Sequence, residues 1–98
     1  MTTKRGFLSM TYDELLSRAI ARASERGSIR QAAPKIGITP VSLGEFVRWR
    51  ETNKFPSDEV LFRIASLAGE DKVKSHFATM AVRAKDPEIS KAYESLLA

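Results

Sequence analysis

Two helix-start patterns stand close together near the middle of the chain, on either side of a glycine. Ser28 and Gln31 have the spacing of a capping box, in which the Ser28 hydroxyl accepts from the Gln31 amide and the Gln31 side chain returns to the Ser28 amide. Thr39 offers an N-cap oxygen, and Pro40 fits the first position of a second helix. Gly37 adopts the left-handed conformation of a tight turn at little cost. The segment therefore predicts two short helices joined by a turn.

The first helix of this pair is expected to be short. Ala32 and Ala33 are small, and Ala33 precedes Gly37 by four residues, a spacing that lets the second helix cross close to the first. Pro34 cannot donate a hydrogen bond to the Arg30 carbonyl and also crowds that carbonyl. We therefore expect the helix to be short or kinked.

The second helix is expected to run from Pro40 to about Glu51, with two different sides. At ~100° per residue, one side collects residues that should pack in the core: Leu43, Phe46, Val47 and the stem of Arg50. The opposite side collects Val41, Gly44, Glu45 and Arg48. This mixed side would face a partner.

The outward side carries side chains that can contact base edges in the DNA major groove. Arg48 could bond guanine O6 and N7, Glu45 could accept from cytosine N4, and Val41 could touch a thymine methyl group. The predicted base contacts are Val41, Ser42, Gly44, Glu45 and Arg48. An exposed Gly44 indicates either close approach to a partner or tolerance of a residue that costs a helix about 1 kcal/mol. The alternative for Glu45 and Arg48 is a solvated charge pair that contributes about 0.2–0.5 kcal/mol.

The charge distribution favours a polyanionic partner for the same region. Residues 1–50 carry nine Lys or Arg and four Asp or Glu, whereas residues 51–98 carry seven and eight. Binding of DNA by the basic half would be sensitive to salt, because each neutralised phosphate releases counterions. The predicted phosphate contacts are polar residues in and around the two helices: Ser28, Gln31, Lys35, Thr39, Asn53 and Lys54. A basic surface without a specific partner and an ordinary polar loop after the second helix are the alternatives.

These residues resemble a known family. The run from Ser28, with Ala33, Gly37, Leu43, the triplet Trp49-Arg50-Glu51, Pro56 and the pair Ile64-Ala65, is similar to the Cro/C1-type (XRE-like) helix-turn-helix of phage repressors and related bacterial regulators. The resemblance covers roughly residues 12–69. It implies a lambda repressor-like fold, DNA binding by the helix-turn-helix, dimers on palindromic operators, and repression or activation. Pro34 departs from the family pattern, and Trp49 and Glu51 come later than in that pattern, which predicts a recognition helix extended by almost a turn.

The whole chain is expected to form one all-α domain, a compact helical bundle. Its 98 residues suffice for a single core. Residues 1–10 show no helical period and are expected to be a flexible N-terminal arm that contacts DNA, or simply a frayed terminus. Residues 11–69 would form the helix-turn-helix DNA-binding module, which opens with a capping box at Thr11 and Glu14.

Residues 70–98 would add two helices to the same domain. Asp71 and Asp86 can cap them. Their apolar residues recur at helical spacing: Val73, Phe77, Met80, Ala81 and Ala84 in the first helix, and Ile89, Ala92, Tyr93, Leu96 and Leu97 in the second. Because a core of this size can absorb only part of that surface, we expect a homodimer through residues 70–98. The alternative is that both helices complete the core of a monomer.

The composition argues against an enzyme or a metal-binding protein. The chain has no cysteine and one histidine, His76, which fits a half-buried or solvated position better than a metal site. The sequence contains no Ser/His/Asp set and no glycine-rich phosphate loop, so neither catalysis nor a cofactor is expected. No apolar run reaches the ~20 residues of a membrane span, and a soluble, cytoplasmic protein is expected.

Two functions remain, and the first is favoured. It is a sequence-specific transcriptional regulator that binds double-stranded DNA as a dimer, in the manner of a small phage or mobile-element repressor that occupies a promoter. The second is a protein-interaction adaptor that keeps the helix-turn-helix scaffold without binding specific DNA. The adaptor would bind through Val41, Glu45 and Trp49, since aromatic residues often anchor protein interfaces.

Overall fold

The computed structural model describes residues 10–97, and its regular elements within them are all helices. They are α2 (Tyr12–Ala23), α3 (Ile29–Ile36), α4 (Pro40–Val47), α5 (Trp49–Thr52), α6 (Asp58–Ala68), α7 (Lys72–Arg83) and α8 (Pro87–Ser95). The predicted all-α fold class is confirmed. Residues 1–9 of the predicted arm lie outside the described residues, whereas Met10, the last residue assigned to the arm, is buried in the core.

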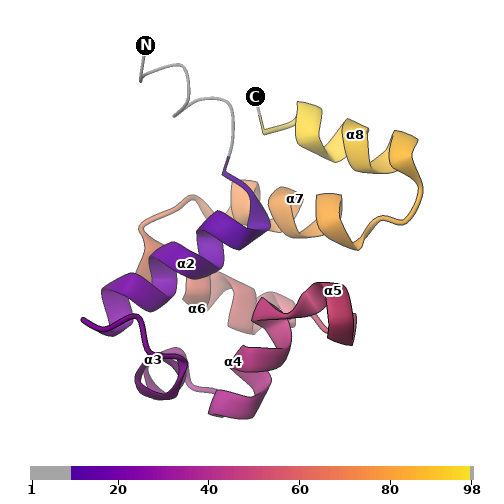
Figure 1. Cartoon of the computed structure of the whole chain (residues 1–98). Coiled ribbons are helices and arrows are strands. Elements are labelled where there is room, and N and C mark those ends of the chain that lie inside the picture. Colours follow the sequence, from indigo (N-terminus) through magenta and orange to yellow (C-terminus); the bar gives the residue numbers. More distant parts are fainter. Residues whose placement is uncertain (1–9, 98) are drawn as a thin grey trace.

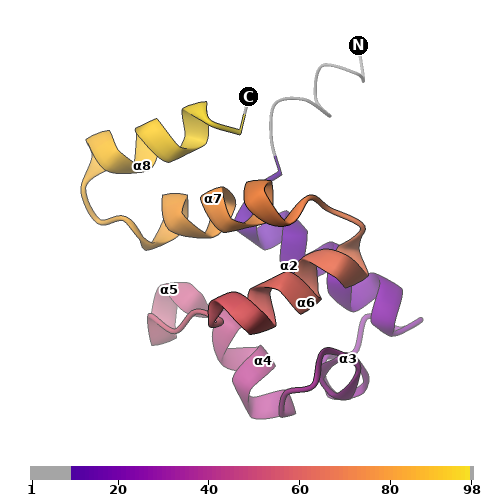
Figure 2. The same ribbon diagram turned by 180° about the vertical axis from the view of Figure 1, so that it is seen from behind.

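The helices are arranged around a central pair, α2 and α6, which pack against each other. Helices α3 and α4 lie at one end of the molecule, and α8 lies at the opposite end, beyond α7 (Figure 1). From behind, α6 and α7 run side by side across the molecule, with α4 below them and α8 above (Figure 2). The helix pair α3–α4 and the C-terminal helices therefore present separate surfaces.

The central pair forms because each helix is capped and has one apolar side. In α2 the predicted capping box is present: Thr11 Oγ1 accepts from the Glu14 amide, and Glu14 Oε1 accepts from the Thr11 amide, each at 3.1 Å. The buried side of α2 consists of Tyr12, Leu15, Leu16, Ala19, Ile20 and Ala23. It packs on Leu61, Ile64, Ala65 and Ala68 of α6. These side chains form most of the hydrophobic core.

Helix α7 turns a side of mostly small residues toward the core. Its buried residues are Ser75, Ala78, Thr79 and Ala81, whereas Val73 is 51% exposed. The hydroxyl of Ser75 donates to the Asp71 carbonyl at 2.8 Å, and that of Thr79 donates to the Ser75 carbonyl at 2.9 Å. Because these hydroxyls are satisfied within their own helix, they can face the core without a buried unpaired polar group. The side of α7 that carries small residues therefore packs inward, and part of its apolar side remains at the surface.

Helix α8 packs mainly on α7. The Phe77 and Tyr93 rings lie 6.2 Å apart, and the Ser90 hydroxyl donates to the Ala81 carbonyl at 2.7 Å. Leu97, just after the helix, is buried, but Ile89 and Leu96 are more than half exposed. The apolar stripe predicted for this helix is thus only partly used in the monomer.

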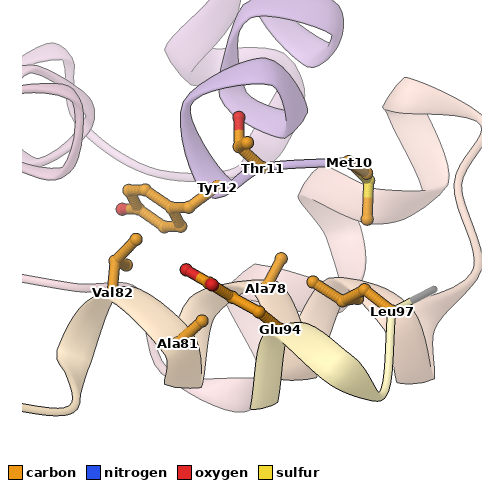
Figure 3. A pocket seen from close by; sticks show the side chains of 8 residues that line it. All are labelled: Met10, Thr11, Tyr12, Ala78, Ala81, Val82, Glu94 and Leu97. Atoms are coloured by element: carbon orange, nitrogen blue, oxygen red, sulfur yellow. The ribbon is translucent and has the colours of Figure 1, made fainter. Parts of the chain in front are cut away.

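A cavity of about 190 Å³ lies between α8, α7 and the start of α2. Its walls are mostly apolar, and the Glu94 side chain extends from α8 toward Tyr12 across it (Figure 3). Met10 and Leu97 close one side of this space. The cavity lies on the α8 side of the molecule, away from α3 and α4 (Figure 1).

The adjacent leucines at the end of the chain test how α8 is held. Leu97 is 7% exposed and Leu96 is 57% exposed. We expect Leu97→Ala to lower the free energy of unfolding by about 2 kcal/mol, the lower end of the range for buried leucines, because the site lies at the edge of the core. Leu96→Ala is the matched control and should change stability by less than about 0.5 kcal/mol. Urea denaturation of both variants measures the difference, and equal losses would contradict this placement of α8.

Candidate nucleic-acid interface

Helix α3 begins at Ser28 as predicted, but the capping box is only half formed. Ser28 Oγ accepts from the Gln31 amide at 3.2 Å. The predicted return bond from the Gln31 side chain to the Ser28 amide is wrong: Ser24 Oγ accepts from that amide at 3.0 Å and donates to Gln31 Oε1 at 2.8 Å. Ser24 is buried directly after α2, and its hydroxyl contacts both the Ser28 amide and the Gln31 side chain. The Gln31 carboxamide is thereby fixed on α3, with its NH2 group left to donate elsewhere.

Pro34 lies inside α3, which continues to Ile36. The helix has eight residues, as expected for a short helix, and Pro34 lies on its exposed side, where water can replace the donor that the Arg30 carbonyl loses. Gly37 ends the helix with φ 87°, in the left-handed region. Its amide donates to the carbonyls of Ala33 and Pro34, at 3.0 and 3.1 Å. The predicted turn is therefore present.

An arginine from α6 holds this turn in place. Arg63 Nη1 donates to the Ile36 carbonyl at 3.3 Å, and its Nη2 forms an ion pair with Glu59 at 2.8 Å. The same Nη1 lies 2.9 Å from the point where a Cβ on Gly37 would stand. Gly37 is thus favoured by its positive φ, and a larger residue there would also displace the Arg63 guanidinium. This contact could not be predicted from local patterns, because Arg63 is distant in sequence from the turn.

Helix α4 begins as predicted and ends earlier than predicted. Thr39 Oγ1 accepts from the Ser42 amide and donates to Ser42 Oγ, both at 3.1 Å. Leu43 is fully buried. The helix ends at Val47, not near Glu51, because Arg48 leaves the helical region with φ −94° and ψ 41°. A separate short helix, α5, follows.

The break at Arg48 allows Trp49 to reach an aromatic cluster formed with Tyr12 and Phe55. The ring centroid of Trp49 lies 6.1 Å from that of Tyr12 and 5.7 Å from that of Phe55. Trp49 Nε1 also donates to Asp13 Oδ1 at 2.9 Å. An uninterrupted helix would carry the indole to another side, so these tertiary contacts outweigh the continuation of α4. The predicted extended recognition helix is therefore wrong.

Arg50 completes this junction, and its predicted place on the inner side of α4 is wrong. Its guanidinium lies 4.3 Å from the centroid of the Trp49 ring and 2.8 Å from Asp13 Oδ2. Partial burial raises the pKa of Asp13, but the hydrogen bonds from Trp49 and Arg50 and the charge of Arg50 outweigh it, so the pKa is lowered. The stability contributed by this contact is present at neutral pH and is lost as the pH falls through the lowered pKa.

Of the five predicted base contacts, the structure leaves four accessible on α4 and the residue after it. Val41 is 71% exposed, Arg48 is exposed, and Ser42 and Glu45 are half-buried. Gly44 is buried, so its predicted exposure is wrong. The reason is Arg48, whose Nη1 lies 3.2 Å from the point where a Gly44 Cβ would stand. The group that closely approaches Gly44 is therefore the side chain of Arg48, the residue directly after α4.

The predicted phosphate contacts form two groups. Ser28, Gln31, Lys35 and Thr39 follow α3 and the start of α4, whereas Asn53 and Lys54 lie beyond α5. Asn53 adopts φ 55°, which ends α5 and leaves both residues exposed. An open hollow between the end of α2 and α3 is lined by Ala23, Ser24, Glu25, Arg26, Gln31 and Lys35. Arg26 was not among the predicted contacts, because only the fold brings the end of α2 beside α3.

The fold divides the basic residues into paired and unpaired ones. Arg18, Arg50 and Arg63 form ion pairs with Glu70, Asp13 and Glu59, respectively. Exposed cations in and around α3–α5 have no ion-pair partner within residues 10–97; they are Arg26, Arg30, Lys35, Arg48 and Lys54. This part of the surface therefore keeps positive charge that the fold does not neutralise.

Comparison of the chain with protein-family models, with curated proteins and with solved structures gives no match. Within residues 10–97 no helix is both long and apolar enough to cross a membrane. In the same part of the chain, no three His, Cys, Asp or Glu side chains come together in a way that could hold a metal ion. The interpretation of the site therefore depends on its own geometry and charge.

Because the Tyr12 hydroxyl is buried where α2 meets α4 and α5, we expect the protein to lose stability at alkaline pH. Tyr12 donates to the Phe46 carbonyl at 3.0 Å, and burial, together with the charge of Asp13, raises the pKa of its hydroxyl well above the usual value. The contribution of the neutral Tyr12 hydroxyl to the free energy of unfolding is complete below the unfolded-state pKa of about 10. It is lost as the pH rises toward the folded-state pKa, by about 1.4 kcal/mol per pH unit. Urea denaturation at increasing pH measures the slope. In Tyr12→Phe the slope should decrease by that amount, and an unchanged slope would contradict the prediction.

Proposed function

We propose that the protein is a sequence-specific DNA-binding transcriptional regulator that inserts α4 into the major groove. The observation that carries this proposal is the side of α4 opposite the buried Leu43, where Val41 is 71% exposed beside the polar Ser42 and Glu45. A single exposed apolar side chain is common on protein surfaces, so the support comes from its combination with these polar neighbours and with the unpaired cations around α3–α5. At the start of a helix in the major groove, Val41 fits the methyl group of thymine.

The dimensions of the helix pair suit this role. An α-helix with its side chains is about 10–12 Å across, which fits the major groove, about 12 Å wide, and the eight residues of α4 span about two turns. Arg48 at the end of α4 would bond guanine, and Glu45 would accept from cytosine. The Gln31 carboxamide and the cations Arg26 and Lys35 would bond phosphates along one strand and so fix the position of α4.

The resemblance to Cro/C1-type regulators supports the same proposal and extends it. It implies that the protein is a cytoplasmic phage or mobile-element repressor that binds a palindromic operator as a dimer. Two copies related by a twofold axis would place their α4 helices in successive major grooves. The half-sites would then be about 34 Å apart, one turn of the duplex.

The contacts of Trp49 weigh against the adaptor. Its ring packs on Tyr12 and Phe55, and its Nε1 donates to Asp13, so its polar and apolar groups are already used within the fold. The unpaired cations around α3–α5 favour a polyanion instead. Binding to random duplex DNA at low salt separates the two functions. A regulator should bind such DNA in a salt-dependent way, whereas an adaptor should show little affinity.

Two substitutions distinguish base contacts from phosphate contacts. Arg48→Ala should weaken binding to a selected operator by about 1–3 kcal/mol and relax the preference at one base pair, because a bidentate contact to guanine is lost. Lys54→Ala should weaken binding to every sequence and reduce the salt dependence by about one counterion. Lys91→Ala, an exposed lysine on α8, is the control and should change neither. Sequence selection and fluorescence anisotropy at several salt concentrations measure these effects. Equal weakening on operator and random DNA would make Arg48 a phosphate contact.

Gly44 should control specificity through Arg48. In Gly44→Ala the new Cβ would stand 3.2 Å from Arg48 Nη1, and the flexible end of that side chain can move away. The variant should keep its stability or gain up to about 1 kcal/mol, because alanine favours helix more than glycine. It should nevertheless lose preference at the base pair that Arg48 contacts. In the Arg48→Ala background, Gly44→Ala should have no further effect on specificity, and an undiminished effect there would contradict the coupling.

A further inference from the structure

A groove between α6 and α7 leaves apolar side chains at the surface. It is lined by Asp58, Phe62, Lys72, Val73, His76 and Phe77. Phe62 is 37% and Val73 is 51% exposed, and Phe77 is half-buried. None of these residues belongs to the proposed DNA-binding surface. An apolar strip of this kind, bordered by charged residues, is typical of an interaction surface.

The two ends of the groove carry opposite charges. Asp58 lies at one end, where its Oδ1 is 3.8 Å from His76 Nδ1. Lys72 lies at the other end, where its Nζ is 5.3 Å from the centroid of the Phe62 ring. Because α6 and α7 are antiparallel, the apolar side chains lie between these charges. A twofold axis perpendicular to the groove would bring Asp58 of each copy onto Lys72 of the other, so the groove is complementary to itself.

The orientation of the groove also fits two copies that bind one duplex. Helices α6 and α7 cross the face shown in Figure 2 from side to side, with α4 below them. The twofold axis that reverses the groove runs within this face, from the α8 end toward the α4 end. It therefore leaves both α4 helices at the same end of the dimer. Packing through the outer side of α8, at the opposite end of the molecule, would direct the two α4 helices away from each other.

We propose that a second copy of this chain docks in the α6–α7 groove, with Phe62, Val73 and Phe77 at the centre of the interface and Asp58–Lys72 ion pairs at both ends. This inference rests on the proposed function for its biological role. It also revises the expected dimer: the apolar residues of α8 lie outside this interface, and Phe62, which precedes residues 70–98, lies within it.

Two matched substitutions locate the interface in solution without DNA. Val73 and Ile89 are each 51% exposed, on α7 and α8 respectively, so lysine should be tolerated by the fold at both positions. Sedimentation at micromolar concentration should show a dimer for the unaltered chain and for Ile89→Lys, and a monomer for Val73→Lys. A monomeric unaltered chain would overturn the proposal. A dimer that survives Val73→Lys would also overturn it.

A charge exchange tests the pairing across the twofold axis. Asp58→Lys makes both ends of the groove positive, and Lys72→Glu makes both ends negative. Each variant alone should dimerise roughly tenfold more weakly, because two ion pairs become two repulsions. An equimolar mixture should form a heterodimer with opposite charges at both ends, and the affinity should recover. Loss of stability by either variant would not produce this recovery, so a mixture that associates no better than its components would overturn the predicted pairing.

The same variants separate this proposal from the proposed function. If Val73→Lys is monomeric and binds a single half-site with an Arg48-dependent preference, both proposals stand. If the unaltered chain dimerises through the groove but does not bind DNA at low salt, the interface stands and the proposed function fails. If the unaltered chain is monomeric and still selects a DNA sequence, the proposed function stands and the interface fails.

Discussion

Tyr12 connects the elements that determine how α4 is presented. Its hydroxyl donates to the Phe46 carbonyl of α4 at 3.0 Å, and its ring contacts Trp49 of α5 and Phe55 of the following loop. The residue is fully buried at the first position of α2, so a change there would reach three segments at once. The hydrogen bond and the ring contacts together tie the C-terminal half of α4 to the central helix pair. The orientation of α4 relative to the core thus depends on one phenol.

The contact between Trp49 and Tyr12 also determines the surface of α4 that faces away from the core. Trp49 reaches Tyr12 only because the chain leaves the helical conformation at Arg48. The same break places Arg48 at the end of α4, from where its guanidinium folds back over Gly44. The helix therefore presents a short surface, with Val41 at its start and Arg48 at its end. A continuous helix to Glu51 would instead have presented a longer surface. Packing in the core thus determines the shape of the outer surface.

Local signals in the sequence predicted much of the fold but less of the site. The Thr11–Glu14 capping box, the start of α4 at Thr39 and Pro40 and the turn at Gly37 depend on neighbours along the chain, and all are present. Features that depend on distant residues were missed. Ser24 replaces half of a capping box, Arg63 holds the turn, and Trp49 ends α4 early because its partners lie elsewhere in the chain. The side of α7 that is buried was not predicted, because bonds within the helix satisfy the hydroxyls of Ser75 and Thr79, which the hydrophobic pattern does not reveal.

The fold also changes what the basic composition of the first half implies. Arg18 and Arg50 are paired with Glu70 and Asp13, respectively, so these two cations are used within the structure. The cations of α3 and the residues beside it have no such partner among the described acidic groups. Because the interaction between exposed charges weakens over a Debye length of about 8 Å at physiological salt, it is this local set, not the net charge, that a nearby phosphate would sense. Within the described residues, unpaired positive charge therefore remains on the segment around α3–α5, which also contains the exposed Val41.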